Sequence, residues 1–283
     1  MDEHDAVLYE LRDHGIGWMT LNRPQALNAM SGGLLASLAG MIDRCMADRA
    51  VRVIVITGAG RGFCSGGDVR DQVARRESGA AASAGRAPLP DAFEASVAAL
   101  HALQMRISYA LHMNGTPSIA AVNGPAAGAG MSLAPACDLR VASDRARFTT
   151  AFRNVGLSGD FGGTYFLSRL AGEGTARELY LTGDVIGAEE ALRTGIVNRV
   201  VPHEHLEEEA MALARRIASG PASAYARIKR NFAVAAKGDL ALLMQEEALN
   251  MHLSGLGAEA REAGRAFLEK RTPDFLGATG AEA

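Results

Sequence analysis

The stretch that most constrains the fold is 117–138, in which an apolar strand passes through glycines directly into an apolar helix. Ser118–Val122 is typical of the strand, residues 123–125 (Asn-Gly-Pro) break it, and a helix-compatible run resumes after residues 128–130 (Gly-Ala-Gly). A helix that begins at such a turn leaves backbone N–H groups free at its positive end. Glycines allow a ligand to approach the backbone closely. The sequence therefore predicts a site for a carbonyl oxygen or a developing oxyanion at this turn.

Alternating strands and helices over the first two thirds of the chain predict an α/β fold. The continuous Val/Ile run at 51–57 is typical of a strand buried on both faces. The other expected strands are at 6–11 and 16–21 (a hairpin), 118–122, 139–142, 147–149 and 197–201. The first helices are expected at 31–49 and 91–112. The second of these would be capped by Asp91 and has an apolar stripe of Phe93, Val97, Leu100 and Leu103.

Only helical patterns follow Pro202. We therefore predict an α/β core at 1–201 that carries the site, and a C-terminal helical region at 202–283. Residues 70–90 are polar and rich in Ala, Gly and Ser, which is typical of a mobile surface segment. The later helices are expected at 169–181, 188–194, 204–218, 223–236, 240–253 and 259–270.

Charge and composition exclude several classes of protein. The formal net charge is −3 over 283 residues, which gives no basic surface for nucleic acid. No apolar run approaches the ~20 residues of a membrane helix, and the acidic N-terminus does not resemble a secretory signal. Three cysteines without paired spacing (Cys45, Cys64 and Cys137) indicate reduced thiols. We expect a cytoplasmic protein with no nucleic-acid or membrane partner.

Several stretches resemble parts of known catalytic or cofactor-binding motifs but lack a residue that the motif requires. A buried strand runs into a glycine-rich loop at 58–62, yet Phe63 stands where a dinucleotide fingerprint needs its third glycine. Cys64 has no histidine nearby in the sequence to activate it, and is interpreted as a space-filling residue. His203 and His205 begin a helix with a solvated acidic first turn, which does not indicate a metal site. We expect no metal and no nucleotide cofactor.

Two aspartates lie in glycine-rich loops. Asp68 follows Gly66 and Gly67, and a turn or helix cap is the better interpretation for it. For Asp160 the cap and an acid/base role are both open. Its apolar neighbours Leu157 and Phe161 favour a raised pKa, which suits acid/base chemistry.

A set of motifs in a fixed order resembles the enoyl-CoA hydratase/isomerase (crotonase) superfamily and covers nearly the whole chain. The motifs are Asn-Arg-Pro-x-Ala-Leu-Asn-Ala at 22–29, Gly-Phe-Cys-Ser-Gly-Gly-Asp at 62–68, Asn-Gly-Pro-Ala-Ala-Gly-Ala-Gly at 123–130, Ala-x-x-Cys-Asp at 134–138, Gly-Gly-Thr at 162–164, Leu-Thr-Gly at 181–183, Ala-x-x-x-Gly-Ile-Val at 191–197 and Ala-Phe-Leu-Glu-Lys-Arg-x-Pro at 266–273.

This resemblance implies a ClpP/crotonase-type spiral of ββα units with a C-terminal helical region that mediates homotrimers, often paired into homohexamers. It implies an acyl-CoA thioester substrate, with coenzyme A as part of the substrate and no separate cofactor. The thioester oxygen would meet the backbone N–H groups of Gly67 and Ala129. The coenzyme A portion would lie along Arg23, Ala26, Leu27, Ser65, Gly66, Gly67, Asp68 and Gly128, with Phe267 and Lys270 of the same or a neighbouring subunit at its far end.

Two departures from the family pattern decide the expected chemistry. The two glutamates of the hydratases would fall at Ser132 and Phe152, and neither residue can do a carboxylate's acid/base work. Asp160 instead matches the aspartate of some family isomerases, including the ring-opening isomerases of phenylacetate breakdown. We therefore predict a double-bond isomerase with Asp160 as the acid/base. The alternatives are a hydratase with atypical groups, a thioester hydrolase that uses Asp160, and a catalytically silent acyl-CoA binder.

Overall fold

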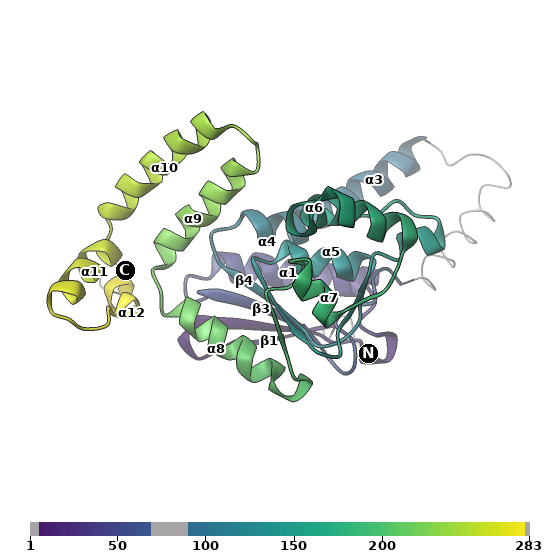
Figure 1. The fold of residues 1–283 in the computed structure, drawn as a ribbon, viewed down its shortest axis with the longest axis horizontal. Helices are drawn as coiled ribbons and strands as arrows, with labels where there is room; N and C mark the ends of the chain where they lie inside the picture. Colours follow the sequence, from purple (N-terminus) through teal and green to yellow (C-terminus); the bar gives the residue numbers. More distant parts are fainter. Residues whose placement is uncertain (1–5, 69–89, 281–283) are drawn as a thin grey trace.

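The computed structural model describes residues 6–68 and 90–280, and its centre is a six-stranded sheet with strand order β1-β2-β3-β4-β6-β9 (Figure 1). β1 pairs antiparallel with β2, and the other neighbours pair in parallel. Every residue of β4 is buried, as its continuous apolar sequence indicates. The strands are β1 (Val7–Arg12), β2 (Ile16–Leu21), β3 (Val53–Gly58), β4 (Ser118–Val122), β6 (Leu139–Ser143) and β9 (Arg199–Val201).

A second, smaller sheet holds the turn after β4. It consists of β5 (Ala126–Ala127), β7 (Arg147–Thr149) and β8 (Ile186–Gly187), in the order β5-β7-β8. A bridge between Cys64 and Ala126 joins β5 to the glycine-rich loop that follows β3. The first residues of the next helix, α5 (Ala129–Ala136), are therefore fixed by both sheets.

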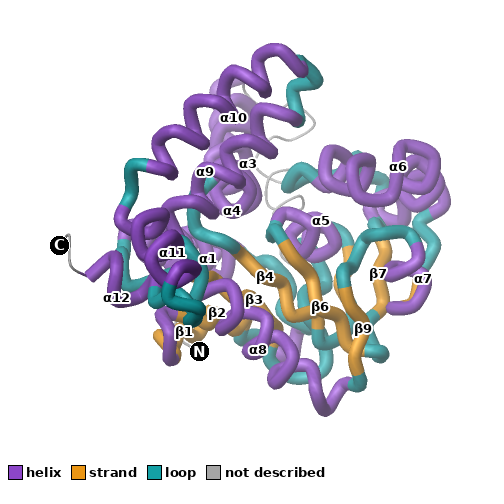
Figure 2. Tube along the Cα trace, turned by 60° about the vertical axis from the view of Figure 1, so that its left-hand side comes forward, coloured by secondary structure: helices purple, strands orange, loops and turns teal. Residues whose placement is uncertain are grey.

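Helices cover both faces of the large sheet, and alternate residues of β3 point to the two sides. Ile54 and Ile56 belong to the core shared with α1 and α5, whereas Val53 and Val55 pack with α8. Figure 2 shows α5 and α8 on opposite sides of the strands. The helices of the α/β part are α1 (Gly32–Ala47), α3 (Pro90–Gln104), α4 (Ala110–Met113), α5, α6 (Gly163–Thr182) and α7 (Ala188–Arg193), with a π-helical turn η4 (Met105–Tyr109) between α3 and α4.

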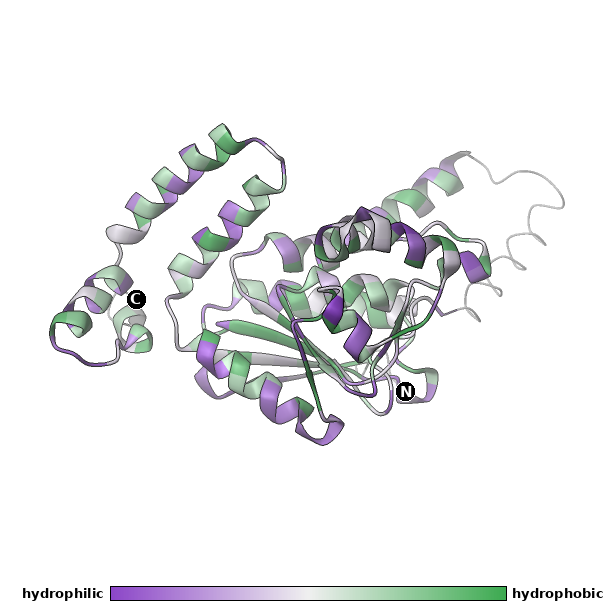
Figure 3. Cartoon of the chain, in the orientation of Figure 1, coloured by the Kyte–Doolittle hydropathy of each residue, from purple (hydrophilic) through white to green (hydrophobic). Residues whose placement is uncertain are grey.

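The C-terminal helices after α8 extend away from this core (Figure 1). They are α9 (Ala222–Ala235), α10 (Leu240–Gly255), α11 (Ala258–Leu268) and α12 (Phe275–Gly280), and α8 spans Leu206–Ala218. Hydrophobic residues lie along α9 and α10 (Figure 3). Met251 and Leu256 are each 75% exposed.

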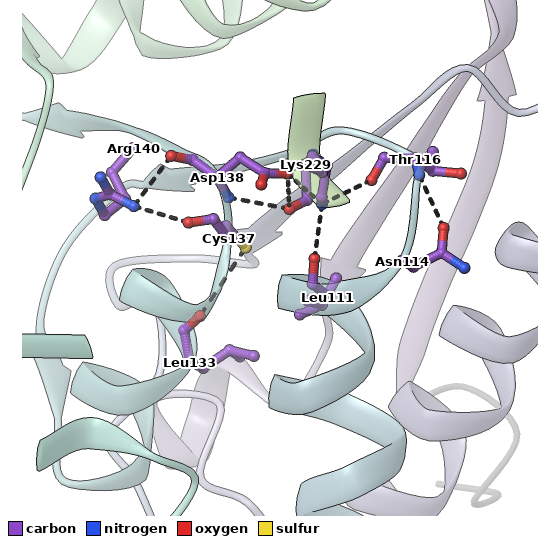
Figure 4. Close-up of polar contacts among 9 residues, drawn as sticks. Leu111, Asn114, Thr116, Leu133, Cys137, Asp138, Arg140 and Lys229 are labelled. Carbon is purple, nitrogen blue, oxygen red and sulfur yellow. Dashed lines mark hydrogen bonds and ion pairs between the residues drawn. The ribbon is translucent and has the colours of Figure 1, made fainter. Parts of the chain in front are cut away.

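A partly buried ion pair attaches α9 to the core (Figure 4). Lys229 Nζ donates to Asp138 Oδ2 at 2.6 Å and to the carbonyl oxygens of Leu111 and Thr116 at 2.9 and 3.1 Å. Asp138 Oδ2 also accepts from the backbone N–H and the hydroxyl of Ser118, at the start of β4. One lysine thus connects α9 to the beginnings of β4 and β6.

The expected elements are present, with some differences at their ends. Pro90 opens α3, so Asp91 lies inside the helix instead of capping it, and Phe93 and Val97 of the apolar stripe are exposed. The helix expected from residue 169 begins earlier, at Gly163, as α6, because the glycines around residue 162 do not indicate a helix start. β5 and β8 were not expected from the sequence, because two-residue strands show no periodicity. The helix α12 was not expected either. The predicted surface segment at 70–90 lies, up to residue 89, outside the described residues.

The three cysteines are buried and unpaired by disulfides. Burial raises the pKa of Cys64 and of Cys137 to about 12, so both remain thiols and act as small packing residues. None of the described helices combines the length and apolar character that a membrane crossing needs.

Candidate active site

A cavity of about 550 Å³ lies beside the turn that begins α5. Its walls come from segments far apart in the sequence: the start of α1, Gly67 and Asp68, one face of α3, Ala129, and the loop from Phe152 to Phe161. The cavity thus collects Gly67, Ala129 and Asp160 at one place.

The Gly67 N–H faces away from its neighbouring segment. Met30 N donates to Gly66 O at 2.7 Å, and Asp68 N donates to Met30 O at 3.4 Å. In this parallel bridge the groups on either side of Gly67 make the bonds, so the N–H of Gly67 itself points to the other side. Within the described part of the chain, no backbone carbonyl accepts from it.

Ala129 is the first residue of α5, so its N–H has no partner inside the helix. The N-cap residue, Gly128, has no side chain to bind the free amides, and its φ of 52° suits glycine. Gly66, with a φ of 86°, lies against this turn, since a methyl group on it would be 2.6 Å from Ala127 O and 3.1 Å from Ala129 N. Glycine at 66 therefore allows the two amides to border one cavity, where they can donate to a single oxygen.

Asp160 is an acidic residue that lines the same cavity as these amides. Burial raises its pKa from 3.8 to about 6. Its Oδ1 atom is buried and has no hydrogen-bond partner among the described residues. A carboxyl group with such a pKa is partly protonated near neutral pH and can both accept and return a proton.

The local backbone shows that Asp160 does not cap a helix. The N-cap of α6 is Gly162, which makes no side-chain cap bond. Left-handed φ values of 107° at Gly159, 50° at Phe161 and 75° at Gly162 turn the chain sharply on both sides of the aspartate. The helix-cap interpretation of Asp160 is thus wrong.

Tyr180 contacts Ser132 and Phe152, the residues at the two positions where family hydratases carry glutamates. Its ring stacks on Phe152, with centroids 6.0 Å apart and planes 7° from parallel. Its hydroxyl shares a hydrogen bond with the Ser132 hydroxyl. Burial, with a smaller contribution from the Asp160 charge, raises the pKa of Tyr180 to about 12, so the hydroxyl stays protonated. Tyr180 was not singled out from the sequence, where it is an ordinary apolar position of a helix.

The residues expected to hold the coenzyme A portion come from two neighbouring loops. Arg23 Nη1 and Nη2 each lie 3.1 Å from Asp68 Oδ2, and Arg23 Nη1 donates to Ala29 O at 2.7 Å. The buried Asn28 joins the loops, because its side chain accepts from Arg23 N and donates to Gly62 O. Asp68 thus pairs with Arg23, and any helix that it would cap lies outside the described residues.

Ser65 completes the contact between these loops. Its hydroxyl donates to Ala26 O at 3.2 Å, and its N–H donates to Leu27 O at 3.0 Å. Leu27 itself is in the left-handed region with a φ of 49°. The structure therefore brings Arg23, Ala26, Leu27 and residues 65–68 together next to the cavity.

Phe267 and Lys270 are not part of this group. Phe267 lies in the last turn of α11 and Lys270 just after the helix ends. Neither is among the described residues that line the cavity, and Phe267 is 82% exposed. A site completed within one chain does not include them.

The apolar stripe of α3 contributes to the cavity wall. Leu100 and Leu103 line the cavity, and Leu103 also packs against the core. Gln104 holds the far side of the Asp160 loop, because its Oε1 atom accepts from Phe161 N at 3.0 Å. An apolar stripe in a sequence cannot distinguish a core from a pocket, since both need the same side chains.

The chain matches the model of the family described as "Enoyl-CoA hydratase/isomerase" over residues 12–278. It is 35% identical over 275 residues to a Rhodobacter capsulatus protein named "Probable enoyl-CoA hydratase", covering 97% of this chain and 99% of that protein. It is 36% identical over 265 residues to the 1,2-epoxyphenylacetyl-CoA isomerase of Escherichia coli, covering 94% and 96%.

Solved structures give the same result for the fold. The enoyl-CoA hydratase from Bacillus anthracis superposes with a TM-score of 0.84 at 30% identity, covering 95% of this chain and 98% of that one. The enoyl-CoA hydratase from Mycobacterium smegmatis gives a TM-score of 0.83 at 32% identity, covering 95% and 98%. The expected crotonase fold is thereby confirmed.

Proposed function

Because the chain belongs to the enoyl-CoA hydratase/isomerase family of acyl-CoA enzymes, we propose that it moves a carbon–carbon double bond within an acyl-CoA thioester, with Asp160 carrying the proton. The observation that carries this proposal is that Asp160 has a buried, unpartnered oxygen on the same cavity as the amides of Gly67 and Ala129. The other carboxyl group on that cavity, Asp68, is paired with Arg23.

The proposed reaction needs one carboxylate and one anion site. The ionised Asp160 removes a proton from the α-carbon of a 3-enoyl thioester, and the electron pair moves onto the thioester oxygen. The N–H groups of Gly67 and Ala129 stabilise that charge; loss of one such donor typically raises a barrier by about 3 kcal/mol. Asp160 then returns the proton to the γ-carbon, the double bond forms between the α- and β-carbons, and no atom is gained or lost.

Hydration makes a larger demand, because water must be positioned and deprotonated while a proton is delivered to the α-carbon. Ser132 and Phe152 supply no carboxylate for this, and both are in contact with Tyr180. The absence of a second acid among the described residues at these positions supports isomerisation over hydration.

We propose that the protein assembles as a homotrimer or homohexamer through its C-terminal helices. The exposed apolar residues of α10 and α11 support an interface there. In such an assembly Phe267 and Lys270 of one subunit would reach the coenzyme A portion bound to a neighbour.

A mass-resolved assay in heavy water tests the proposed reaction. The protein is incubated with matched 2-enoyl and 3-enoyl CoA esters, the products are separated, and their molecular masses are measured by mass spectrometry. We expect interconversion of the two isomers without the added mass of water, and its loss in Asp160→Asn. A product heavier by one water would indicate a hydratase, and free coenzyme A would indicate a hydrolase. Tight binding of the esters without any reaction would indicate a silent binder.

A further inference from the structure

A second cavity lies behind the wall of the first. It has a volume of about 320 Å³ and is bounded by η4, α4 and the start of α6. Phe161 lines both cavities, which makes them neighbours, and it is 2% exposed. Phe161 has a left-handed φ of 50°, a strained conformation for an aromatic residue that is typical of functional sites.

Two polar groups of the second cavity lack partners. Ser108 is 3% exposed, and its hydroxyl has no hydrogen-bond partner in the described chain. Nε2 of His112, one turn further along, is likewise buried and unpartnered among the described residues. Leaving such a group buried and unpaired is unfavourable, so both groups favour a ligand that bonds to them.

The helix around Ser108 is itself irregular. Met105–Tyr109 forms a π-helical turn, a feature found mostly at functional sites, where it displaces side chains from their regular helical positions. A serine in a regular helix can bond to the carbonyl four residues before it. Ser108 makes no such bond, and the residue lines the cavity with its buried hydroxyl unpartnered among the described residues.

The remaining walls suit a ring. His112 packs edge-to-face against Tyr165 and Phe166, with centroids 5.7 and 5.2 Å away, which fixes its orientation. Burial lowers the pKa of His112, so its ring is neutral. A cavity of about 150 Å³ is enough for benzene. The space here therefore admits an aromatic ring with a substituent.

We propose that this second cavity receives the distal end of the acyl group, and that Ser108 and His112 select an aryl or similarly bulky acyl chain that carries a hydrogen-bonding oxygen. This inference rests on the proposed function in that the thioester must lie in the first cavity. The acyl chain then passes Phe161 to reach Ser108.

Binding of saturated esters tests this without relying on turnover. Phenylacetyl-CoA and 3-phenylpropionyl-CoA, each with and without a para-hydroxyl group, are titrated by calorimetry. We expect the wild type to bind at least one hydroxylated ester about tenfold tighter than its unsubstituted partner. Ser108→Ala should remove that preference while changing the affinity for the plain ester less than twofold. Ser108→Thr, which keeps a hydroxyl, should retain the preference.

Matched variants separate this role from a structural one. His112→Phe keeps the ring packing against Tyr165 and Phe166 and should weaken binding of the hydroxylated esters selectively. Ser168→Ala removes a hydroxyl that bonds to Thr164 O on the exposed side of α6, and should change nothing. Equal affinities of the wild type for every hydroxylated and plain pair, or equal losses for both members in Ser108→Ala, would overturn the proposal.

The proposed reaction and this subsite can fail separately. Asp160→Asn should keep the preference for hydroxylated esters although it abolishes isomerisation. A wild type that discriminates between the esters but isomerises nothing would refute the reaction and leave the subsite standing. A wild type that isomerises but does not discriminate would refute the subsite alone.

Discussion

The ionisation of Asp160 sets the pH range in which the site can remove a proton. Its raised pKa of about 6 means that the carboxylate form is lost as pH falls through that value. We expect kcat/KM for isomerisation to be level above pH 7 and to fall about tenfold per pH unit below 6. A pH–rate profile between pH 4.5 and 8 measures this, and a limb near pH 4 would contradict the assignment of Asp160 as the base.

The same residue lowers the stability of the fold at neutral pH. Because the pKa is raised in the folded state, the charged form is penalised by folding above about pH 6, and the penalty disappears below the unfolded value of 3.8. Asp160 is partly exposed, which reduces the effect. We expect Asp160→Asn to lower kcat by 10²–10⁴ but to raise the free energy of unfolding by about 1 kcal/mol at pH 7.

Denaturant titrations at two pH values check this expectation. The difference between Asp160→Asn and the wild type should shrink towards zero at pH 4. An equal gain at both pH values would mean that the stability change does not come from the charge of Asp160.

At the scale of single elements, the first turn of α5 has the most specific function. Proline is tolerated at the first position of a helix, so Ala129→Pro removes one N–H without interrupting the helix. We expect kcat to fall by about 10²–10³, while the melting temperature changes little. Ala258→Pro makes the same substitution at the first position of α11, away from the cavity, and should leave kcat unchanged. Equal losses in both variants would contradict the assigned role of the Ala129 amide.

Some of these elements could be predicted from the sequence and others could not, for physical reasons. The β4–α5 turn was predictable because glycines, a buried strand and a helix follow each other within twenty residues. The π-helical turn at Met105–Tyr109 was not, since nothing in a helical periodicity distinguishes one wider turn. Tyr180 was missed because its partners, Ser132 and Phe152, are contacts of the folded chain that no spacing in the sequence indicates.

At the scale of the whole molecule, Lys229 links the C-terminal helices to the sheet. Its side chain is 9% exposed, and its replacement leaves the partly buried Asp138 without its cation. We expect Lys229→Met to lower the free energy of unfolding by about 2 kcal/mol, the range for hydrogen bonds to charged groups. The neighbouring Arg230 pairs with Glu246 at 3.0 Å on the surface, so Arg230→Met should cost less than about 1 kcal/mol. Chemical denaturation measures both, and similar losses would refute a special role for Lys229.

The proposed assembly through the C-terminal helices can be tested at the exposed apolar residues of α10. Met251 and Leu181 are each 75% exposed, but only Met251 lies on the C-terminal helices. We expect Met251→Asp to dissociate the oligomer and Leu181→Asp to leave it intact, as measured by light scattering after gel filtration. A wild-type protein that is monomeric at micromolar concentration would contradict the proposed assembly.

Tyr180 also restricts how this protein can change over evolutionary time. A glutamate at 132 alone would face the Tyr180 hydroxyl in a space that already lies against Gly163, and a glutamate at 152 alone would remove the ring on which Tyr180 stacks. Each single step towards two carboxylates thus damages the packing before any new chemistry is gained. We therefore expect a glutamate at 132 or 152 to be accommodated only together with a change at Tyr180, which makes the three positions interdependent in any redesign of this site.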